Sequence, residues 1–184
     1  MLYIIRHGRT DWNDLHKLQG RTDIPLNEDG RKMAKKAALE IKDVHFDICF
    51  CSPLKRAAET AQILLEGRDI PLVYDDRLVE MGFGEYEGIA GYFDGIDSPV
   101  SAFFMNPERY SAPIAAGAES MDELFERTGS FLEEKVMPEL KQGRDVLIVG
   151  HGAMNSAIIS RIKKLPLKDF WSAGIENCKL MKLC

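Results

Sequence analysis

The fold is decided by the stretch Tyr3-Ile4-Ile5-Arg6-His7-Gly8-Arg9-Thr10, in which a short apolar run ends on an arginine, a histidine and a glycine. The run from Leu2 to Ile5 has the length and β-branched content of a buried strand, and Gly8 marks the turn after it. Ligands bind at the carboxyl ends of strands in open α/β sheets. Arg6 and His7 are therefore expected in a site, because arginine suits phosphate or carboxylate and histidine suits nucleophilic attack or proton transfer near neutral pH.

The same pattern returns at Asp145 to Gly152, where an apolar strand again ends in His-Gly. Taken alone, Arg6 and His7 could equally be a surface arginine and a histidine bonded to a backbone carbonyl. The second copy favours a site. The apolar residues Val146 to Val149 are typical of a central strand in a parallel sheet, so His151 is expected at the same edge as His7.

A third strand end contributes another arginine. Phe46 to Cys51 is a predicted strand, after which Ser52 is a good N-cap and Pro53 fits the first helical position. This places Arg56 in the first helical turn, from which its side chain can reach the pocket of Arg6. An exposed helix arginine is the alternative interpretation.

The remaining pattern alternates strands with helices. Asn27 is expected to cap an amphipathic helix that packs on the sheet, and Ser120 with Glu123 forms a predicted capping box. Further elements are expected at Ile70 to Tyr74 and Asn177 to Leu183 (strands), and at Leu124 to Val136 and Ala153 to Lys163 (helices). This order predicts an α/β fold, a three-layer α/β/α sandwich with a mostly parallel central sheet and helices on both faces. Residues 1–184 are expected to form a single domain.

Composition excludes several classes of partner. The net charge of −5 argues against nucleic acid and against an anionic membrane surface, because both require a basic face. No apolar run of the sequence is long enough for a membrane span, and the first strand begins too early to leave room for a signal peptide. The protein is therefore expected to be cytoplasmic. The 4 cysteines show no metal-binding or redox spacing and are expected to be reduced.

Further motifs lie between the two His-Gly segments. In chain order they are Trp12-Asn13, Gln19-Gly20, Pro25-Leu26, Cys51-Ser52-Pro53-Leu54-Lys55-Arg56-Ala57, Glu59-Thr60-Ala61, Leu78 to Gly88 and Glu119-Ser120. With the two His-Gly segments, they resemble the histidine phosphatase superfamily, the phosphoglycerate-mutase-like phosphatases, over almost the whole chain. The chain departs from the family pattern at Arg9, where an acid or amide is usual, and at Met33, where glutamine is usual.

The resemblance implies a metal-independent phosphomonoesterase that acts on a small phosphorylated metabolite through a phosphohistidine. It makes His7 the nucleophile and Glu80 the proton donor. Two nearby carboxylates, Glu85 and Glu87, are alternatives for the acid, and Glu87 is favoured as a structural residue.

The resemblance also assigns the residues around the phosphoryl group. Its oxygens would be held by four side chains: Arg6, Arg56, His151 and Asn13. Further substrate contacts are expected from Gln19, Gly20, Thr22 and Gly152, the last at the start of a helix whose amide dipoles favour an anion. No cofactor and no metal is implied, and the oligomeric state is left open.

Three alternatives remain beside this interpretation. A metal site could explain two histidines, but it would need a carboxylate ligand and no crowding arginines. A phosphoglycerate mutase would share the pocket, although the family's mutases have longer chains with added basic segments. A phosphate-binding module without turnover would be expected to lack His7 or Glu80, and both are present.

The segment Ile89 to Ala118 is rich in aromatic residues, broken by prolines and without a sustained period, so a lid or insertion over the pocket is expected at about 89–118. It holds more acids than bases, namely Asp94, Asp97 and Glu108 against Arg109, and its aromatic residues are Tyr92, Phe93, Phe103, Phe104 and Tyr110. Such a lid predicts a neutral, ring-shaped or partly apolar leaving group rather than a second phosphate or carboxylate. Cations outside the lid that could reverse this preference are Arg9, Arg21 and Arg77.

Overall fold

A computed structural model describes residues 1–90, 100–111 and 117–184. Their centre is a 5-stranded sheet with the strand order β3-β2-β4-β1-β5. The strands are β1 (Leu2–Arg6), β2 (Ile48–Cys51), β3 (Leu72–Tyr74), β4 (Val146–Gly150) and β5 (Met181–Lys182). Neighbouring strands β1 and β4, β4 and β2, and β2 and β3 run parallel, and only β5 pairs antiparallel, with β1. The prediction of a mostly parallel sheet is confirmed.

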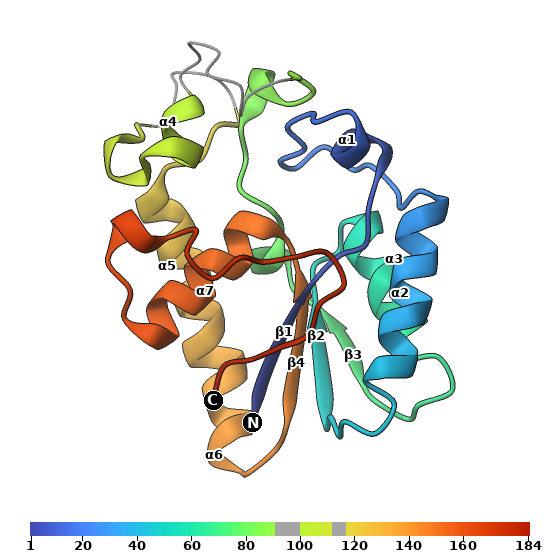
Figure 1. Cartoon of the computed structure of the whole chain (residues 1–184). Coiled ribbons are helices and arrows are strands. Elements are labelled where there is room, and N and C mark those ends of the chain that lie inside the picture. The colour runs from blue at the N-terminus through green and yellow to red at the C-terminus, as the bar shows by residue number, and fades with distance from the viewer. Residues whose placement is uncertain (91–99, 112–116) are drawn as a thin grey trace.

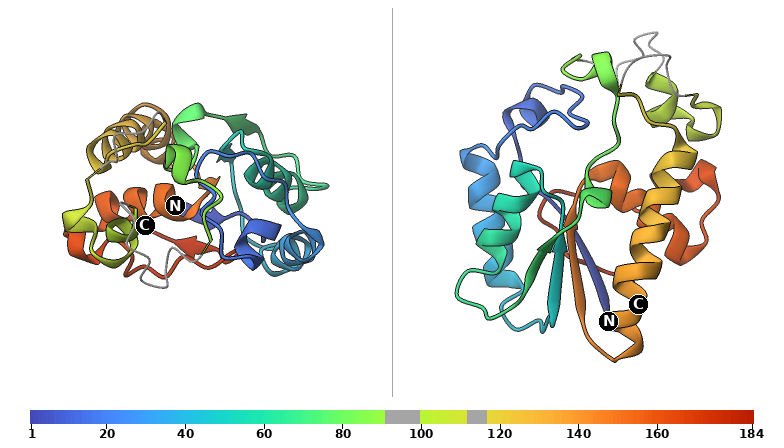
Figure 2. Two further views of the ribbon diagram at one scale, coloured as in Figure 1. Left: turned by 90° about the horizontal axis from the view of Figure 1, so that it is seen from above. Right: turned by 180° about the vertical axis from the view of Figure 1, so that it is seen from behind.

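Helices cover both faces of this sheet (Figures 1 and 2). One face carries α2 (Glu28–Glu40) and α3 (Lys55–Leu64). The other carries α5 (Met121–Phe131), a π-helical segment (Leu132–Val136), α6 (Met137–Lys141) and α7 (Gly152–Lys163). The predicted α/β sandwich is therefore confirmed. Among the described residues, no helix is long and apolar enough to cross a membrane.

Short elements gather above the carboxyl edge of the sheet, at the top of Figure 1. They are α1 (Asp11–Asp14), α4 (Ser101–Met105) and the 3₁₀ turns Gly84–Tyr86 and Pro107–Arg109. Two further 3₁₀ turns span Asp76–Leu78 and Leu167–Asp169. Because parallel strands end at this edge, these short elements lie where the sequence places the site.

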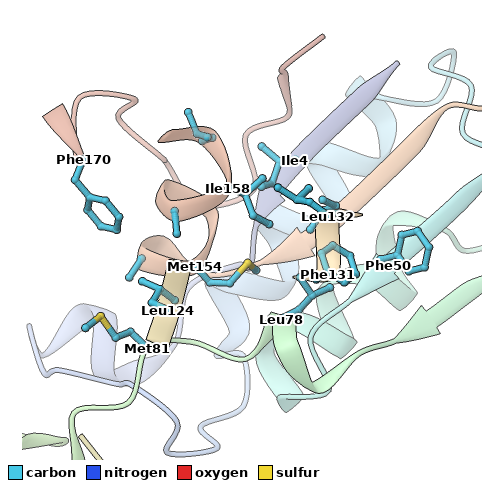
Figure 3. Close-up of a cluster of buried hydrophobic side chains, with 14 of the residues drawn as sticks. Ile4, Phe50, Leu78, Met81, Leu124, Phe131, Leu132, Met154, Ile158 and Phe170 are labelled. Carbon is cyan, nitrogen blue, oxygen red and sulfur yellow. The ribbon is translucent and has the colours of Figure 1, made fainter. Parts of the chain in front are cut away.

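Alternation along the strands divides the core into two layers. On the α5–α7 face lie Leu2, Ile4 and Phe50, together with helix residues such as Phe131 and Ile158 (Figure 3). On the α2–α3 face lie the intervening strand residues Ile5, Cys49, Cys51, Leu147 and Val149. Both faces of β4 are buried, as expected of a central strand in a parallel sheet. The three buried cysteines are free thiols.

Several elements differ from the predictions. Strands β2 and β3 each begin two residues later than the predicted Phe46 and Ile70. The helix after β2 begins at Lys55, and its N-cap is Leu54 rather than Ser52. The Ser52 hydroxyl accepts from the Leu54 amide at 3.3 Å and is also bonded to His151 Nε2 at 2.8 Å. The last strand is shorter than predicted, because Cys178 has a φ of 56° that interrupts the extended chain. The predicted helix after Ser120 passes through the π-helical segment just before Pro138, whose missing N–H cannot join a regular α-helical ladder.

Candidate active site

The sheet register brings the two histidines together. Arg6 of β1 is paired with Gly150 of β4, and the His7 amide donates to the Gly150 carbonyl at 3.0 Å. The two imidazole rings that follow, His7 and His151, have centroids 5.1 Å apart. Both side chains are buried. Main-chain pairing at the centre of the sheet therefore fixes their separation.

Hydrogen bonds define the tautomer of His7. Its Nδ1 lies 2.6 Å from the carbonyl oxygen of Gly8. Because a carbonyl can only accept, Nδ1 carries the hydrogen and Nε2 of the neutral ring keeps its lone pair. Nε2 accepts from Arg56 Nε at 3.3 Å. Burial, followed by the charges of Arg56 and Arg6, holds the pKa of His7 well below its usual value, so the ring is neutral at neutral pH.

Arg56 is fully buried, and main-chain oxygens orient its guanidinium group. Nη1 donates to the carbonyl of Thr22 at 2.9 Å, and Nη2 donates to the carbonyl of Gly20 at 2.7 Å. Burial lowers the pKa of Arg56 to about 10, which leaves it cationic at neutral pH. Arg6 also lines the pocket, and its Nη1 donates to the carbonyl of Ile175 at 3.3 Å.

The loop that orients Arg56 is itself held by Glu87. The Glu87 carboxylate accepts from the amides of Arg21 at 2.9 Å, Thr22 at 2.7 Å and Phe83 at 3.0 Å. Gly20 has a φ of 54°, and a Cβ there would collide with this carboxylate. The structural role expected of Glu87 agrees with these contacts. The Thr22 side chain also donates to Glu87, so Thr22 orients Arg56 through its carbonyl and does not line the pocket.

Glu80 occupies the amino end of α7. Its Oε1 accepts from the amides of Met81 at 2.9 Å and Met154 at 3.0 Å, and its Oε2 accepts from that of Ala153 at 3.2 Å. The amide dipoles expected to face the substrate anion from Gly152 therefore face the Glu80 carboxylate. Both Glu80 and Gly152 line the pocket.

His151 lies behind the pocket rather than on its wall. Its Nε2 is 2.8 Å from the Ser52 hydroxyl, and its Nδ1 has no hydrogen-bond partner among the described residues. Burial is the main cause that holds its pKa well below the usual value, and the charge of Arg56 adds to it. The structure therefore brings His151 beside His7 as a second neutral ring.

The pocket above His7 has a volume of about 490 Å³. Of the residues predicted from sequence, its lining includes Arg6, His7, Asn13, Gln19, Gly20, Arg56, Glu80 and Gly152. The lining also includes four aromatic side chains, those of Phe83, Phe103, Phe104 and Trp171, which we call the aromatic wall. The Trp171 ring stacks on Phe104, with centroids 5.6 Å apart and an interplanar angle of 19°, and its Nε1 donates to the Phe103 carbonyl at 2.9 Å.

Sequence reasoning missed Trp171 and the rim residues Gly174, Ile175 and Glu176. They follow α7 in a stretch without helical or strand period, which gave no signal of its own. Of the residues expected in the lid, Phe103 and Phe104 line the pocket, whereas Tyr92, Phe93, Asp94 and Asp97 lie outside the described residues.

Charge in the pocket is limited to a few side chains. Within the described residues, the lining cations are Arg6 and Arg56, and the lining acids are Glu80 and Glu176. The cations that could have supplied a second anion site are paired elsewhere. Arg9 pairs with Asp14, Arg21 with Glu119 at 3.1 Å and Arg77 with Asp75 at 2.7 Å. The described residues contain no group of three or more His, Cys, Asp or Glu side chains arranged to hold a metal.

Comparisons with known proteins find phosphatases and related mutases. A curated relative, a 2,3-bisphosphoglycerate-dependent phosphoglycerate mutase of Cytophaga hutchinsonii, is 33% identical over 92% of this chain and 80% of its own. Uncharacterized phosphatase PhoE of Bacillus subtilis is 36% identical over 86% of this chain and 75% of its own. The crystal structure of the alpha-ribazole phosphatase of Shigella flexneri matches with a TM-score of 0.79 and 26% identity, over 97% of this chain and 87% of that one.

The family model that matches the chain is described as the histidine phosphatase superfamily, branch 1. The match runs over residues 2–184 and thus includes both strand ends that carry the histidines, the Arg56 helix and the Glu80 loop. Since this match covers nearly the entire sequence, the chain belongs to the histidine phosphatase superfamily.

Proposed function

We propose that the protein is a metal-independent phosphomonoesterase that hydrolyses a small phosphorylated metabolite through a phosphohistidine at His7. One observation carries this proposal. The Nδ1 hydrogen of His7 is held by the Gly8 carbonyl, which leaves Nε2 with its lone pair beside Arg56 on a pocket wall that also includes Arg6. A neutral imidazole beside two guanidinium groups suits attack on a phosphoryl dianion.

In the first step, His7 Nε2 attacks phosphorus and the bond between phosphorus and the ester oxygen breaks. The electron pair goes to the leaving oxygen, which takes a proton from protonated Glu80. Arg6 and Arg56 hold the phosphoryl oxygens, with Asn13 at the same wall.

In the second step, the Glu80 carboxylate takes a proton from water. The water oxygen attacks phosphorus, the bond between phosphorus and Nε2 breaks, and its electron pair returns to His7. Inorganic phosphate leaves, and Glu80 is again protonated for the next turnover.

The pocket supports a neutral, ring-shaped leaving group. Phe104 and Trp171 offer a stacked aromatic surface, and Glu176 at the rim would repel a second acidic group. We assign the lid role to residues 89–118, of which Phe103 and Phe104 supply part of this surface. The likeness to an alpha-ribazole phosphatase fits the same class of substrate. Such a substrate is a cytoplasmic metabolite, so the cytoplasm is the location that we propose.

A phosphoglycerate mutase is the second candidate, because a relative with 33% identity carries that name. A mutase must hold the carboxylate of its substrate as well as the phosphate. Within the described residues, Arg6 and Arg56 are the lining arginines, and both face the phosphoryl site. This charge distribution favours the phosphatase.

Two assays test the proposal. Hydrolysis of an aryl phosphate should proceed at the same rate with and without EDTA, and loss of activity on chelation would contradict metal independence. Incubation with 3-phosphoglycerate should release phosphate faster than it forms 2-phosphoglycerate. The reverse order of rates would make the protein a mutase. Tight phosphate binding with no hydrolysis on any substrate would instead indicate a binding module.

A further inference from the structure

A cluster of charged side chains lies outside the pocket and has no part in the mechanism above. Glu119 is 5% exposed, and it receives two hydrogen bonds from Arg127, at 2.6 Å from Nε and 3.0 Å from Nη2. Arg21 Nη2 approaches the same carboxylate at 3.1 Å. We refer to Glu119, Arg127 and Arg21 as the carboxylate clamp.

The clamp residues form hydrogen bonds with the main chain on both sides of Glu80. Arg127 Nη1 donates to the carbonyls of Arg77 at 2.6 Å and Val79 at 2.8 Å. Beyond Glu80, the amide of Gly82 donates to Glu119 Oε2 at 3.3 Å. The carbonyl of Glu80 itself accepts from Arg21 Nε at 3.4 Å.

The segment that carries Glu80 needs such support, because no strand ladder holds it. The preceding 3₁₀ turn ends at Leu78, and the next pairing with another segment is the isolated bridge of Phe83 with Ala118. Main-chain carbonyls in such a segment require donors. The bidentate ion pair of Arg127 with Glu119 supplies a rigid donor fork to this segment.

Stability alone is a weak reason for this arrangement. A buried ion pair often contributes no more to stability than apolar residues of similar volume would. Proton transfer, by contrast, is sensitive to geometry, and a misplacement of about 1 Å can cost about 10²-fold in rate. During turnover the Glu80 carboxylate must exchange its bonds to the amides of Ala153 and Met154 for the leaving oxygen, while its main chain stays in place.

We propose that Arg127, both directly and through Glu119, is a positioning residue that sets the Glu80 carboxyl at the leaving oxygen. This inference rests on the proposed function, in which Glu80 is the general acid. Arg127 acts through the main chain of residues 77–82, and among the described residues it is not part of the pocket lining.

The dependence of rate on the leaving group tests this role. An alkyl phosphate has a poor leaving group that needs a proton, whereas p-nitrophenyl phosphate has a good one that needs little help. The quantity to measure is kcat/KM, because it reports the steps up to release of the leaving group and not the later hydrolysis of the phosphoenzyme.

The variant Arg127→Met removes the donors and keeps an unbranched side chain. We expect its kcat/KM to fall about 10- to 100-fold for glycerol phosphate and less than about 3-fold for p-nitrophenyl phosphate. The same substitution at Arg161, which forms an exposed ion pair with Glu133 at 2.8 Å, is the matched control and should change neither value.

A double variant shows whether the effect passes through the acid. In the Glu80→Gln background, Arg127→Met should cause no further loss with glycerol phosphate, because residues that act as a unit are not additive. Full additivity would overturn the proposal. So would an equal loss on both substrates, or no loss on either.

A second variant and the activity of the wild-type protein complete the test. If Arg127→Met does not fold, Glu119→Gln can replace it, because it weakens the same ion pair. This variant should show the same selective loss of kcat/KM with glycerol phosphate. A Glu119→Gln protein without that selective loss would overturn the proposal. If the wild-type protein hydrolyses neither phosphate, the proposed function and the positioning role both fall. A phosphatase in which Arg127→Met has no selective effect would lose only the positioning role.

Discussion

The two walls of the pocket are built in different ways. The wall with Arg6, His7 and the nearby His151 stands on the ends of β1 and β4, whose parallel register fixes the side chains through main-chain pairing. The opposite wall, with Glu80, Phe104 and Trp171, stands on 3₁₀ turns, short helices and unpaired segments. In the mechanism proposed above, the sheet thus positions the residues that bind the phosphoryl group, whereas side-chain contacts such as the carboxylate clamp position the proton donor and the residues that contact the leaving group.

This contrast predicts two classes of variant. Changes at the strand-end wall should affect every phosphate ester equally, because the phosphoryl group is common to all of them. Changes at the opposite wall should discriminate between leaving groups.

The largest effect is expected at Arg56. Arg56→Met removes a buried cation beside His7, and a single charge-stabilising arginine is worth about 10³- to 10⁵-fold in phosphoryl transfer. The kcat/KM should fall by at least about 10³-fold for glycerol phosphate and p-nitrophenyl phosphate alike. Arg31→Met is the control, since Arg31 forms an ion pair with Glu59 at 2.5 Å on the surface. A loss with only one of the two substrates would contradict the expectation that the strand-end wall acts on the phosphoryl group alone.

Glu80→Gln should give the next largest effect, and a selective one. General acid catalysis contributes about 10²- to 10⁴-fold, so kcat/KM for glycerol phosphate should fall by about 10²- to 10³-fold. The loss with p-nitrophenyl phosphate should be far smaller. The matched control is Glu85→Gln, an exposed neighbour that should keep its activity. If Glu85→Gln caused the selective loss, the acid would be misassigned.

Burial of His7 and His151 predicts a dependence of stability on pH. Both have pKa values held well below 6.5 in the folded protein. As the pH falls below 6.5, the unfolded chain binds protons that the folded one does not, so the free energy of unfolding falls with pH. The slope approaches about 1.4 kcal/mol per pH unit for each histidine, which is tenfold in the unfolding equilibrium. Above the unfolded pKa this contribution is constant.

Urea unfolding at a series of pH values checks this slope. His151→Asn should reduce it, while His16→Asn, at an exposed histidine with a φ of 50° that asparagine tolerates, should leave it unchanged. Equal slopes in all three proteins would show that His151 titrates normally in the folded state.

The smallest effect is expected at the aromatic wall. Phe104→Leu removes a ring that stacks on Trp171, and an aromatic pair is worth about 0.5–1.5 kcal/mol. The ratio of kcat/KM for a nucleoside monophosphate to that for glycerol phosphate should fall by about 2- to 10-fold. Tyr74→Leu, at an exposed ring on the edge strand, is the control. An unchanged ratio would remove the aromatic wall from substrate recognition.

The residues of the strand-end wall could be predicted from the sequence because local sequence patterns mark them. An apolar run followed by His-Gly occurs twice, and a parallel sheet brings such ends together whatever the loops do. Arg56 was placed in the first helical turn for the same reason. The N-cap was predicted two residues too early: the helix is capped at Leu54, while the Ser52 hydroxyl bonds His151, 99 positions away in the chain, and also accepts from the Leu54 amide.

Fewer residues of the opposite wall could be predicted, because contacts between segments far apart in the sequence determine their positions. Trp171 has no period around it that marks a site, and its place depends on stacking with Phe104. Thr22 was expected to contact the substrate, but its side chain donates a hydrogen bond to Glu87. The motif around Leu78 to Gly88 singled out Glu80, but nothing local indicated that Arg127 would hold its main chain.

The central claim is that His7 is the nucleophile, and the phosphoenzyme tests it most directly. Rapid quenching during turnover of p-nitrophenyl phosphate, followed by mass spectrometry at high pH, should find one phosphate on His7. This phosphate should be lost in acid, and His7→Ala should give a folded protein with neither adduct nor turnover. Turnover without any phosphate on His7, or phosphate on another residue, would contradict the account.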